Sequence, residues 1–256
     1  MVDPYIGITD FMNFGQVKRM QRIFKKHLTS DSQRKLHVGV MMSRKTLYEL
    51  ETKWANVFPP KEKIAKIFSS RSTMNCLHYA DYENDPKLGQ SLARAISYGG
   101  RGINALQLDM IWPDPKKIAK GLSFCDHAIE VILQINTRSL EVVHNSPGGL
   151  VKKLKKYNGI IHRVLLDKSM GRGRWMSLTE MLKYINVLNQ NLPQLGVGIA
   201  GGISPKNIFL LGAIANRYPH ISIDAQGQLR PSGSTLDPID WKIAQDYLVE
   251  ALRYFK

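Results

Sequence analysis

The chain has 256 residues, of which 43% are hydrophobic and 22% are charged, and 36 Lys and Arg against 21 Asp and Glu give a formal net charge of +15. This composition excludes a disordered or fibrous protein and suffices for a large buried core. No stretch approaches the ~18 consecutive apolar residues of a membrane span, and the start, MVDPYIGITDF, lacks the features of an export signal, so we expect a cytosolic protein.

Short apolar runs recur along the chain with helical patterns between them, which indicates repeated β-α units around a parallel sheet. Eight runs begin near Tyr5, Leu36, Met74, Ala105, Ile129, Ile160, Val197 and Ile221. Division gives 256/8 = 32 residues per unit, the size of one step in a barrel of roughly 250 residues. The sequence therefore predicts an α/β fold, a (β/α)8 TIM barrel with parallel strands, in a single domain over residues 1–256.

The first helical pattern has apolar residues three and four positions apart. They are Phe14, Val17, Met20, Phe24 and Leu28. Further along, Gly99, Gly100 and Gly102 close a helical pattern and precede a strand. A dinucleotide-binding loop has the opposite order, so these glycines predict a helix end.

Three later segments carry signals for helix starts. Ser177 and Glu180 have the spacing of a capping box, in which each side chain accepts from a free backbone amide. Ser204-Pro205 and Asp237-Pro238 each place a cap residue before a proline, which predicts helices that begin at those points.

Alternate side chains of a strand face the barrel axis or the surrounding helices. We expect the apolar members to point inward, and they are Ile6, Ile8, Val40, Leu106, Leu108, Leu165, Val197, Ile199 and Ile223. A shift of one position in register would move every one of these side chains to the other face.

The excess of basic residues predicts attraction to anions such as nucleic acid, an acidic membrane surface or a phosphorylated metabolite. The lysines lie mostly on outer helix faces, so a solvated basic surface is the simplest interpretation. Cys76 and Cys125 lie among apolar residues, which favours reduced, buried thiols over a disulfide.

In such a barrel the active site lies at the carboxyl ends of the strands. The residues that end the runs there are Thr9 and Asp10, Ser43 and Arg44, Tyr79 and Asp81, Asp109, Asn136 and Arg138, Asp167 and Lys168, and Asp224 to Gly227. Five carboxylates and several cations are thus expected on one face. For any single residue, a loop cap or a surface ion pair is the commoner role.

The strongest local signal is VGIAGGIS at 197–204, where an apolar strand ends in Gly201 and Gly202 before an expected helix start. Glycines allow a phosphate to approach backbone amides, and a helix start adds partial positive charge. The eighth run ends in a polar loop with Gln226 and Gly227. Because the loops after strands 7 and 8 commonly bind phosphate in this architecture, we predict a phosphate site there, with a tight turn as the alternative.

The order of these motifs resembles that of phosphoribosylanthranilate isomerases of tryptophan synthesis. That family opens with a Cys-Gly-Ile-Thr strand, which corresponds to residues 6–9, and its Val-Gln-Leu-His-Gly pattern resembles residues 106–109. Its Leu-Leu-Asp strand resembles residues 165–167, and a glycine-rich loop follows both. Its Ala-Gly-Gly-Leu-x-Pro-x-Asn stretch matches residues 200–207, and its Val-Asp-x-Ser-Ser-Gly ending corresponds more loosely to residues 223–227.

The resemblance implies a phosphorylated ribose-type ligand and an Amadori rearrangement, in which an acid opens a ribosylamine and a base removes the C2 proton. It implies that Asp167 is the acid and that Gly171 and Gly173 belong to a ligand-binding loop. The basic cysteine of the family falls on Ile6, which cannot accept a proton. Another group must then be the base, or this reaction is not performed.

Two carboxylates are candidates for that base, Asp10 and Asp109. Arg44 is a candidate for the family's carboxylate-binding arginine. Asp109 replaces a histidine of the family and puts a negative charge where an anionic aromatic acid requires neutral or positive surroundings. A phosphorylated sugar fits these changes better than anthranilate does.

Three functions remain open at this level: an isomerase on a phosphoribosyl substrate, a barrel that binds such a ligand without turnover, and a nucleic-acid binder. The last lacks a recognised motif. The seven histidines show no His-x-x-x-His spacing. We therefore expect no metal or other cofactor, a phosphorylated small molecule as the partner, no membrane or nucleic-acid partner, and leave a homodimer open.

Overall fold

The computed structural model describes residues 2–55, 57–167 and 177–256. Eight parallel strands close into a barrel in which each strand pairs with its neighbours in sequence and β8 pairs with β1. The strands are β1 (Tyr5–Thr9), β2 (Lys35–Ser43), β3 (Met74–Ala80), β4 (Ala105–Asp109), β5 (Glu130–Ile135), β6 (Arg163–Asp167), β7 (Gly196–Ala200) and β8 (Ser222–Ala225). The predicted (β/α)8 TIM barrel is confirmed.

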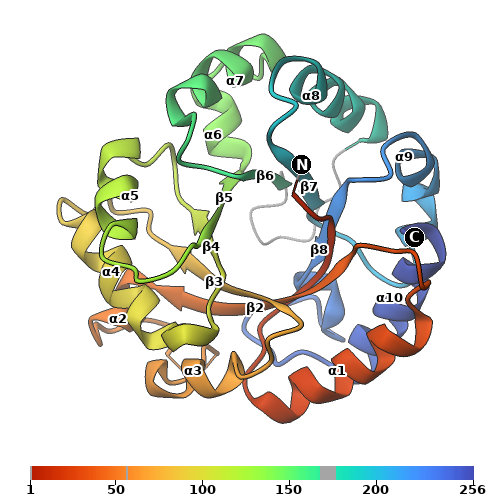
Figure 1. The fold of residues 1–256 in the computed structure, drawn as a ribbon, viewed down its shortest axis with the longest axis horizontal. Coiled ribbons are helices and arrows are strands. Elements are labelled where there is room, and N and C mark those ends of the chain that lie inside the picture. The colour runs from red at the N-terminus through yellow and green to blue at the C-terminus, as the bar shows by residue number, and fades with distance from the viewer. Residues whose placement is uncertain (1, 56, 168–176) are drawn as a thin grey trace.

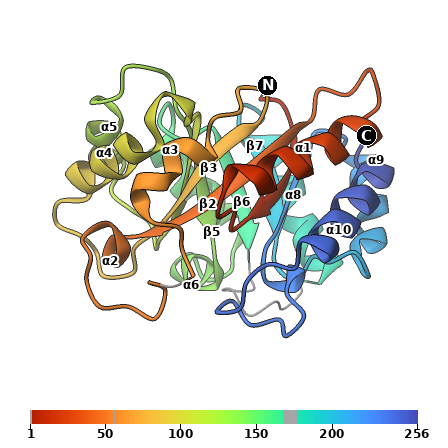
Figure 2. The same cartoon turned by 90° about the horizontal axis from the view of Figure 1, so that it is seen from below.

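Helices form a ring outside the strands, as Figure 1 shows. They are α1 (Phe14–His27), α2 (Arg44–Leu47), α3 (Ile64–Ile67), α4 (Leu88–Gly99), α5 (Pro115–Leu122), α6 (Thr137–Val142), α7 (Pro147–Leu154), α8 (Leu178–Asn191), α9 (Gly212–Arg217) and α10 (Trp241–Tyr254). The first and last of these, α1 and α10, lie side by side (Figure 2). No helix among the described residues is long and apolar enough to cross a membrane.

The prediction of which side chains point inward is wrong for every residue but one. Eight of the nine belong to the layer between strands and helices, where they pack with helix residues such as Val17 and Met20: Ile6, Ile8, Val40, Leu106, Leu108, Val197, Ile199 and Ile223. Leu165 alone belongs to the separate cluster inside the barrel, with Tyr5, Met74, Cys76, Ala105, Ile132 and Ala200. Both faces of this sheet are buried, and the face that meets amphipathic helices takes the branched apolar residues.

The barrel interior holds polar side chains, and glycines make room for them. A Cβ atom on Gly7 would lie 2.6 Å from Oδ1 of Asp224 and 2.9 Å from Nδ1 of His37. A Cβ atom on Gly39 would collide with the hydroxyl of Thr9. Because nearby atoms occupy the space of any larger side chain, these two strand positions require glycine.

Several helix boundaries agree with the sequence signals. The helix α1 covers the predicted apolar stripe. Gly99 ends α4, and the next residue, Gly100, has a φ of 58°. At the start of α8, the Ser177 hydroxyl accepts from the amide of Glu180 at 3.2 Å, as the capping pattern predicts.

Two predicted helix starts are wrong. Ser204-Pro205 begins a turn, in which the amide of Ile208 donates to the Ser204 carbonyl at 3.1 Å, and α9 begins only at Gly212. Asp237-Pro238 precedes α10 by several residues, and its cap is Asp240. The Asp237 carbonyl instead accepts from Nε of Arg230 at 2.6 Å, which holds this segment as a loop.

Side chains join the two ends of the chain where β8 meets β1. The Thr9 hydroxyl lies 3.2 and 3.1 Å from the two carboxylate oxygens of Asp224, a residue 215 positions away. Below the strands, Nη1 of the buried Arg34 donates to the Ile221 carbonyl at 2.8 Å. We call this junction the β8–β1 seam.

Candidate functional site

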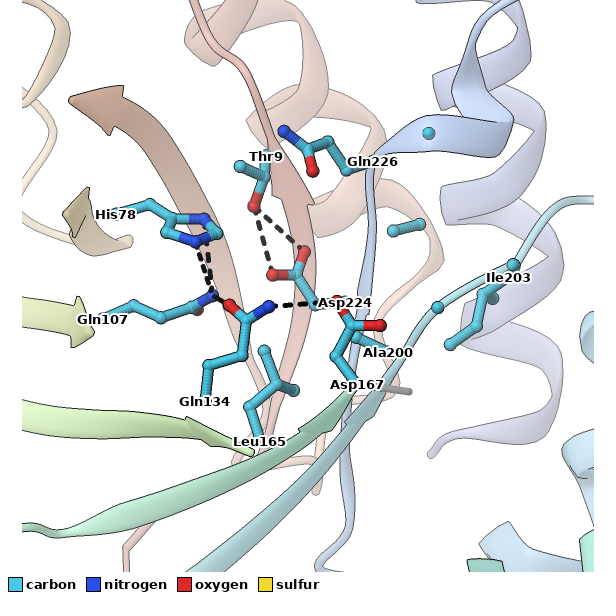
Figure 3. Close-up of a pocket in the computed structure, with 14 residues that line it drawn as sticks. Thr9, His78, Gln107, Gln134, Leu165, Asp167, Ala200, Ile203, Asp224 and Gln226 are labelled. Atoms are coloured by element: carbon cyan, nitrogen blue, oxygen red, sulfur yellow. Dashed lines mark hydrogen bonds between the residues drawn. The ribbon is translucent and has the colours of Figure 1, made fainter. Parts of the chain in front are cut away.

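The carboxyl ends of the strands surround a pocket, which Figure 3 shows and which we call the inner pocket. Its lining combines residues from inside the barrel with the loops that follow β7 and β8. These residues are Thr9, His78, Gln107, Gln134, Leu165, Asp167, Ala200, Gly201, Gly202, Ile203, Asp224, Ala225, Gln226 and Gly227. The site is therefore at the end of the barrel that the fold predicts.

Asp224 is the most deeply buried carboxylate of the inner pocket, with 5% of its surface exposed. It leaves β8 toward the barrel axis, where Gly7 of the neighbouring strand leaves space for it. Burial raises the pKa of Asp224 to about 7, although the hydrogen bond from Thr9 lowers it. A carboxyl group with this pKa can donate or accept a proton near neutral pH.

Asp167, at the end of β6, is held by a chain of amide side chains (Figure 3). Nε2 of Gln134 donates to Oδ2 of Asp167 at 3.0 Å, and Nε2 of Gln107 donates to Oε1 of Gln134 at 2.8 Å. Gln107 also lies 3.3 Å from the ring nitrogens of His78. Burial lowers the pKa of His78 to about 4, so its ring is neutral near pH 7.

The rim of the inner pocket consists of backbone in an unusual conformation. Gly201 and Gly202 have φ angles of 94° and 70°, in the left-handed region that favours glycine. Nδ2 of Asn207 donates to the Gly202 carbonyl at 2.7 Å, and Oδ1 of Asn207 accepts from the Ser204 amide at 2.8 Å. The four residues predicted to bind phosphate, Gly201, Gly202, Gln226 and Gly227, all line this pocket.

A wider outer pocket continues from the inner one, and the two share His78, Gln134, Asp167 and Gln226. Its other residues come mainly from β2, β3, β4 and the segments that follow them: Met41, Ser43, Arg44, Lys45, Glu51, Thr52, Lys53, Trp54, Phe58, Ala80, Asp81, Tyr82, Glu83, Asp109, Arg138 and Thr235. Among the described residues, no group of three or more His, Cys, Asp or Glu side chains is arranged to hold a metal ion.

Asp109 lies on the wall of the outer pocket, at the end of β4. The Tyr82 hydroxyl donates to Oδ1 of Asp109. Nδ2 of Asn136 donates to the Tyr82 oxygen at 3.0 Å and lies 3.5 Å from the same Oδ1. Oδ2 of Asp109 is 4.0 Å from Nε2 of His78, and burial raises the pKa of Asp109.

Arg44 also lines the outer pocket, at the start of α2. Its guanidinium lies 3.0 Å from Glu83 and 3.7 Å from Asp85, so acidic side chains already neutralise it. Gly171 and Gly173 lie outside the described residues.

Asp10 follows β1 but lines neither pocket. Its carboxylate is paired with the guanidinium of Arg230, and both side chains are almost fully buried. Nε2 of Gln226 donates to the same carboxylate oxygen at 3.0 Å. Asp10 thus holds the loop after β8 in place, and the carboxylates that reach the inner pocket are Asp167 and Asp224.

The polar residues inside the strands, His78, Gln107 and Gln134, were missed in the sequence. For Gln107, the apolar neighbours Leu106 and Leu108 were expected to face inward instead. The signal was present in segments such as Leu106-Gln107-Leu108, where one polar residue alternates with two apolar ones. Ile6, which occupies the family's cysteine position, faces the helix layer. Its side chain therefore lies outside the inner pocket.

Solved structures share this barrel at low sequence identity. The 3-keto-L-gulonate-6-phosphate decarboxylase of Vibrio cholerae is 13% identical, with the full length of both chains covered and a TM-score of 0.55. A putative spore coat polysaccharide biosynthesis protein E from Chromobacterium violaceum is 9% identical, with 99% of this chain and 75% of the other covered and a TM-score of 0.63. The protein is thus a TIM-barrel protein.

Sequence similarity is local. No family model matches the chain. The N-(5'-phosphoribosyl)anthranilate isomerase of Methanocella arvoryzae is 31% identical over 84 residues, which are 32% of this chain and 39% of that protein. The match therefore spans about two fifths of the relative's length.

Proposed function

We propose that the protein binds a phosphorylated ribose-type compound in the inner pocket and isomerises it by acid/base catalysis, in the manner of phosphoribosylanthranilate isomerases. The observation that carries this proposal is the presence of two carboxylates, Asp167 and Asp224, beneath a rim of left-handed glycines in one pocket. The local similarity to an isomerase of that name supports it.

The phosphate binds at the rim, where Gly201 and Gly202 lack side chains that would cover the backbone. Gln226 and Gly227 of the loop after β8 complete this part of the pocket. A phosphate bound here brings the ribose part of the ligand next to both carboxylates.

The two carboxylates divide the proton transfers. The resemblance gives Asp167 the role of the acid, which delivers a proton to the ring oxygen as the C1–O bond breaks. Asp224 then removes the C2 proton to give an enolamine. A proton added at C1 and the proton lost from the 2-hydroxyl convert it to the 2-keto product, so no atoms are gained or lost overall. The raised pKa of Asp224 suits it to take a proton from carbon, because a more basic carboxylate is the stronger general base. Asp10 is ion-paired outside the pockets and Asp109 lies further out, so Asp224 replaces both as the proposed base.

A turnover assay tests the proposal. It follows the loss of phosphoribosylanthranilate fluorescence with the purified parent, Asp167→Asn and Asp224→Asn proteins. Each substitution is expected to lower kcat by about 10²–10⁴, the usual share of one acid/base group. Calorimetric titration with ribose 5-phosphate tests the phosphate site, and Gly202→Val is expected to abolish binding. Equal affinity of folded Gly202→Val and parent protein would remove the site from consideration.

A barrel that binds the ligand without turnover is the second candidate. The position of Ile6 favours it, because the family's cysteine is absent there and the side chain faces the helices. Binding of ribose 5-phosphate by a parent protein that does not turn over phosphoribosylanthranilate would favour this alternative. Ile6→Cys is expected to restore no activity in either case, since its thiol would lie in the helix layer.

A further inference from the structure

The wall of the outer pocket carries a carboxylate without a neutralising cation. Asp109 has 17% of its side chain exposed, and among the described residues no Lys or Arg nitrogen lies within 4.0 Å of it. The basic group nearest to it in that range is the ring of His78, which burial keeps neutral near pH 7. A ligand that approaches this carboxylate therefore meets no Lys or Arg contact to it from the part of the chain that the structure describes.

The hydrogen bonds of Asp109 leave one oxygen available to a ligand. Tyr82 and Asn136 both lie at Oδ1 and fix the orientation of the carboxylate. Oδ2 accepts no hydrogen bond from any residue that the structure describes, and its distance of 4.0 Å to His78 is too long for one. An ionised carboxylate oxygen in this position favours a hydrogen-bond donor on the ligand.

The position of Asp109 relative to the phosphate site determines which part of the ligand it meets. The glycine rim lies at the ends of β7 and β8, whereas Asp109 ends β4, across the barrel mouth. His78, Gln134 and Asp167 line both pockets and connect the two. A ligand with its phosphate at the rim thus extends its other end toward Asp109.

Two aromatic side chains of the outer pocket suit a planar ring. The rings of Trp54 and Phe58 are stacked at 5.6 Å and 6°, and both line the pocket. Lys45 is paired with Glu83 at 2.9 Å, as Arg44 is at 3.0 Å. The other two cations of the pocket, Lys53 and Arg138, lie over the rings of Trp54 and Tyr82.

We propose that Asp109 selects a phosphoribosyl compound whose group furthest from the phosphate is a planar ring with a neutral hydrogen-bond donor, such as a carboxamide. This inference rests on the proposed function. A carboxylate at the same place on the ring would face the Asp109 carboxylate, and like charges at close range oppose binding. The donor of a carboxamide would instead satisfy Oδ2.

Two probes that differ only in this group test the proposal. Reductive amination of ribose 5-phosphate with anthranilamide or with anthranilate gives stable N-aryl amino-ribitol phosphates that carry a carboxamide or a carboxylate. Calorimetric titration of the parent protein is expected to show binding of the carboxamide at least about ten-fold tighter. Asp109→Asn is expected to remove this preference, with Asp109→Ser as a second variant if the first does not fold.

The control is Asp246→Asn, which removes an exposed carboxylate of α10 and is expected to leave the preference unchanged. The role of Asp109 would be overturned if the parent bound the carboxylate probe equally or more tightly, or if the preference survived in both Asp109 variants. Either result would leave the phosphate site standing. Failure of ribose 5-phosphate and both probes to bind would overturn the phosphate site and this inference together.

Discussion

Replacement of Asp224 by Asn is expected to stabilise the protein at alkaline pH. Burial raises the pKa of Asp224 from 3.8 to about 7, so above that pH the folded protein holds an ionised carboxylate away from water. An asparagine at this position occupies nearly the same volume and keeps an oxygen that accepts the hydrogen bond from Thr9. The substitution therefore removes the buried charge with little change in packing.

The size of the effect follows from the pKa difference of about 3 units. At 1.36 kcal/mol for each unit, ionised Asp224 costs roughly 4 kcal/mol of folding free energy. The folded state keeps its proton to a higher pH than the unfolded state does, so the cost is absent below about pH 4. It grows between about pH 4 and 7 and is constant above that range. In a chain of this size, the unfolding midpoint of the variant should rise by roughly 8–16 °C at about pH 8.

Urea unfolding of the parent and Asp224→Asn proteins, followed by circular dichroism from about pH 4 to 8, measures this difference. His37 and His78, whose pKa values burial lowers to about 3 and about 4, add a stability that rises with pH in both proteins, and subtraction removes it. Asp246→Asn, at an exposed position, is the matched control. A stability difference that does not change with pH, or a variant less stable than the parent at about pH 8, would refute the reasoning.

Two further substitutions test the packing around the site. Gly7→Ala would place a Cβ atom 2.6 Å from Asp224 and is expected to cost about 1–3 kcal/mol in urea unfolding, whereas Gly148→Ala, with its nearest atom at 3.9 Å, should cost nothing. Equal stability of these two variants would contradict the close approach. Asp10→Asn leaves Arg230 buried without its countercharge and is expected to cost about 3–5 kcal/mol. Adding Arg230→Met should recover part of that loss, and a double variant as unstable as the sum of the single ones would argue against the pair.

The fold could be predicted because each strand and helix carries its own local signal. The apolar run at Ile6 and the stripe of α1 each define one element, and the barrel is the simplest way to bury all of them. The largest error in a strand start is at β6, predicted from Ile160 and observed from Arg163. The local sequence pattern thus predicts the start of each strand to within about three residues.

The face of each strand could not be predicted in the same way. Ile6 and Gly7 are neighbours, and either could face the axis, because both surfaces of the sheet are buried. The choice depends on the volume that the helices must fill, which is a property of the whole fold. For the same reason, most of the residues expected to point inward were assigned to the wrong face. The hydrogen bond between Gln107 and Gln134 inside the barrel was not predicted either.

Cap signals alone did not decide where every helix begins. Ser177 is the cap of α8, as predicted, but Asp237 and Asp240 both precede α10 and only the second caps it. The contact that decides between them is the bond from Arg230 to the Asp237 carbonyl. Such a contact between loop segments has no signature in a short window of sequence.

The β8–β1 seam has a consequence for how the protein folds. Its side-chain contacts join Thr9 to Asp224, 215 positions apart, and Asp10 to Arg230, 220 positions apart. Contacts of such long sequence separation are slow to form, because the entropy of closing the chain must be overcome before they contribute. During synthesis, β1 can pair early with β2 but must wait for almost the whole chain before its second partner, β8, emerges. Binding competence should therefore be among the last properties that a newly made molecule acquires.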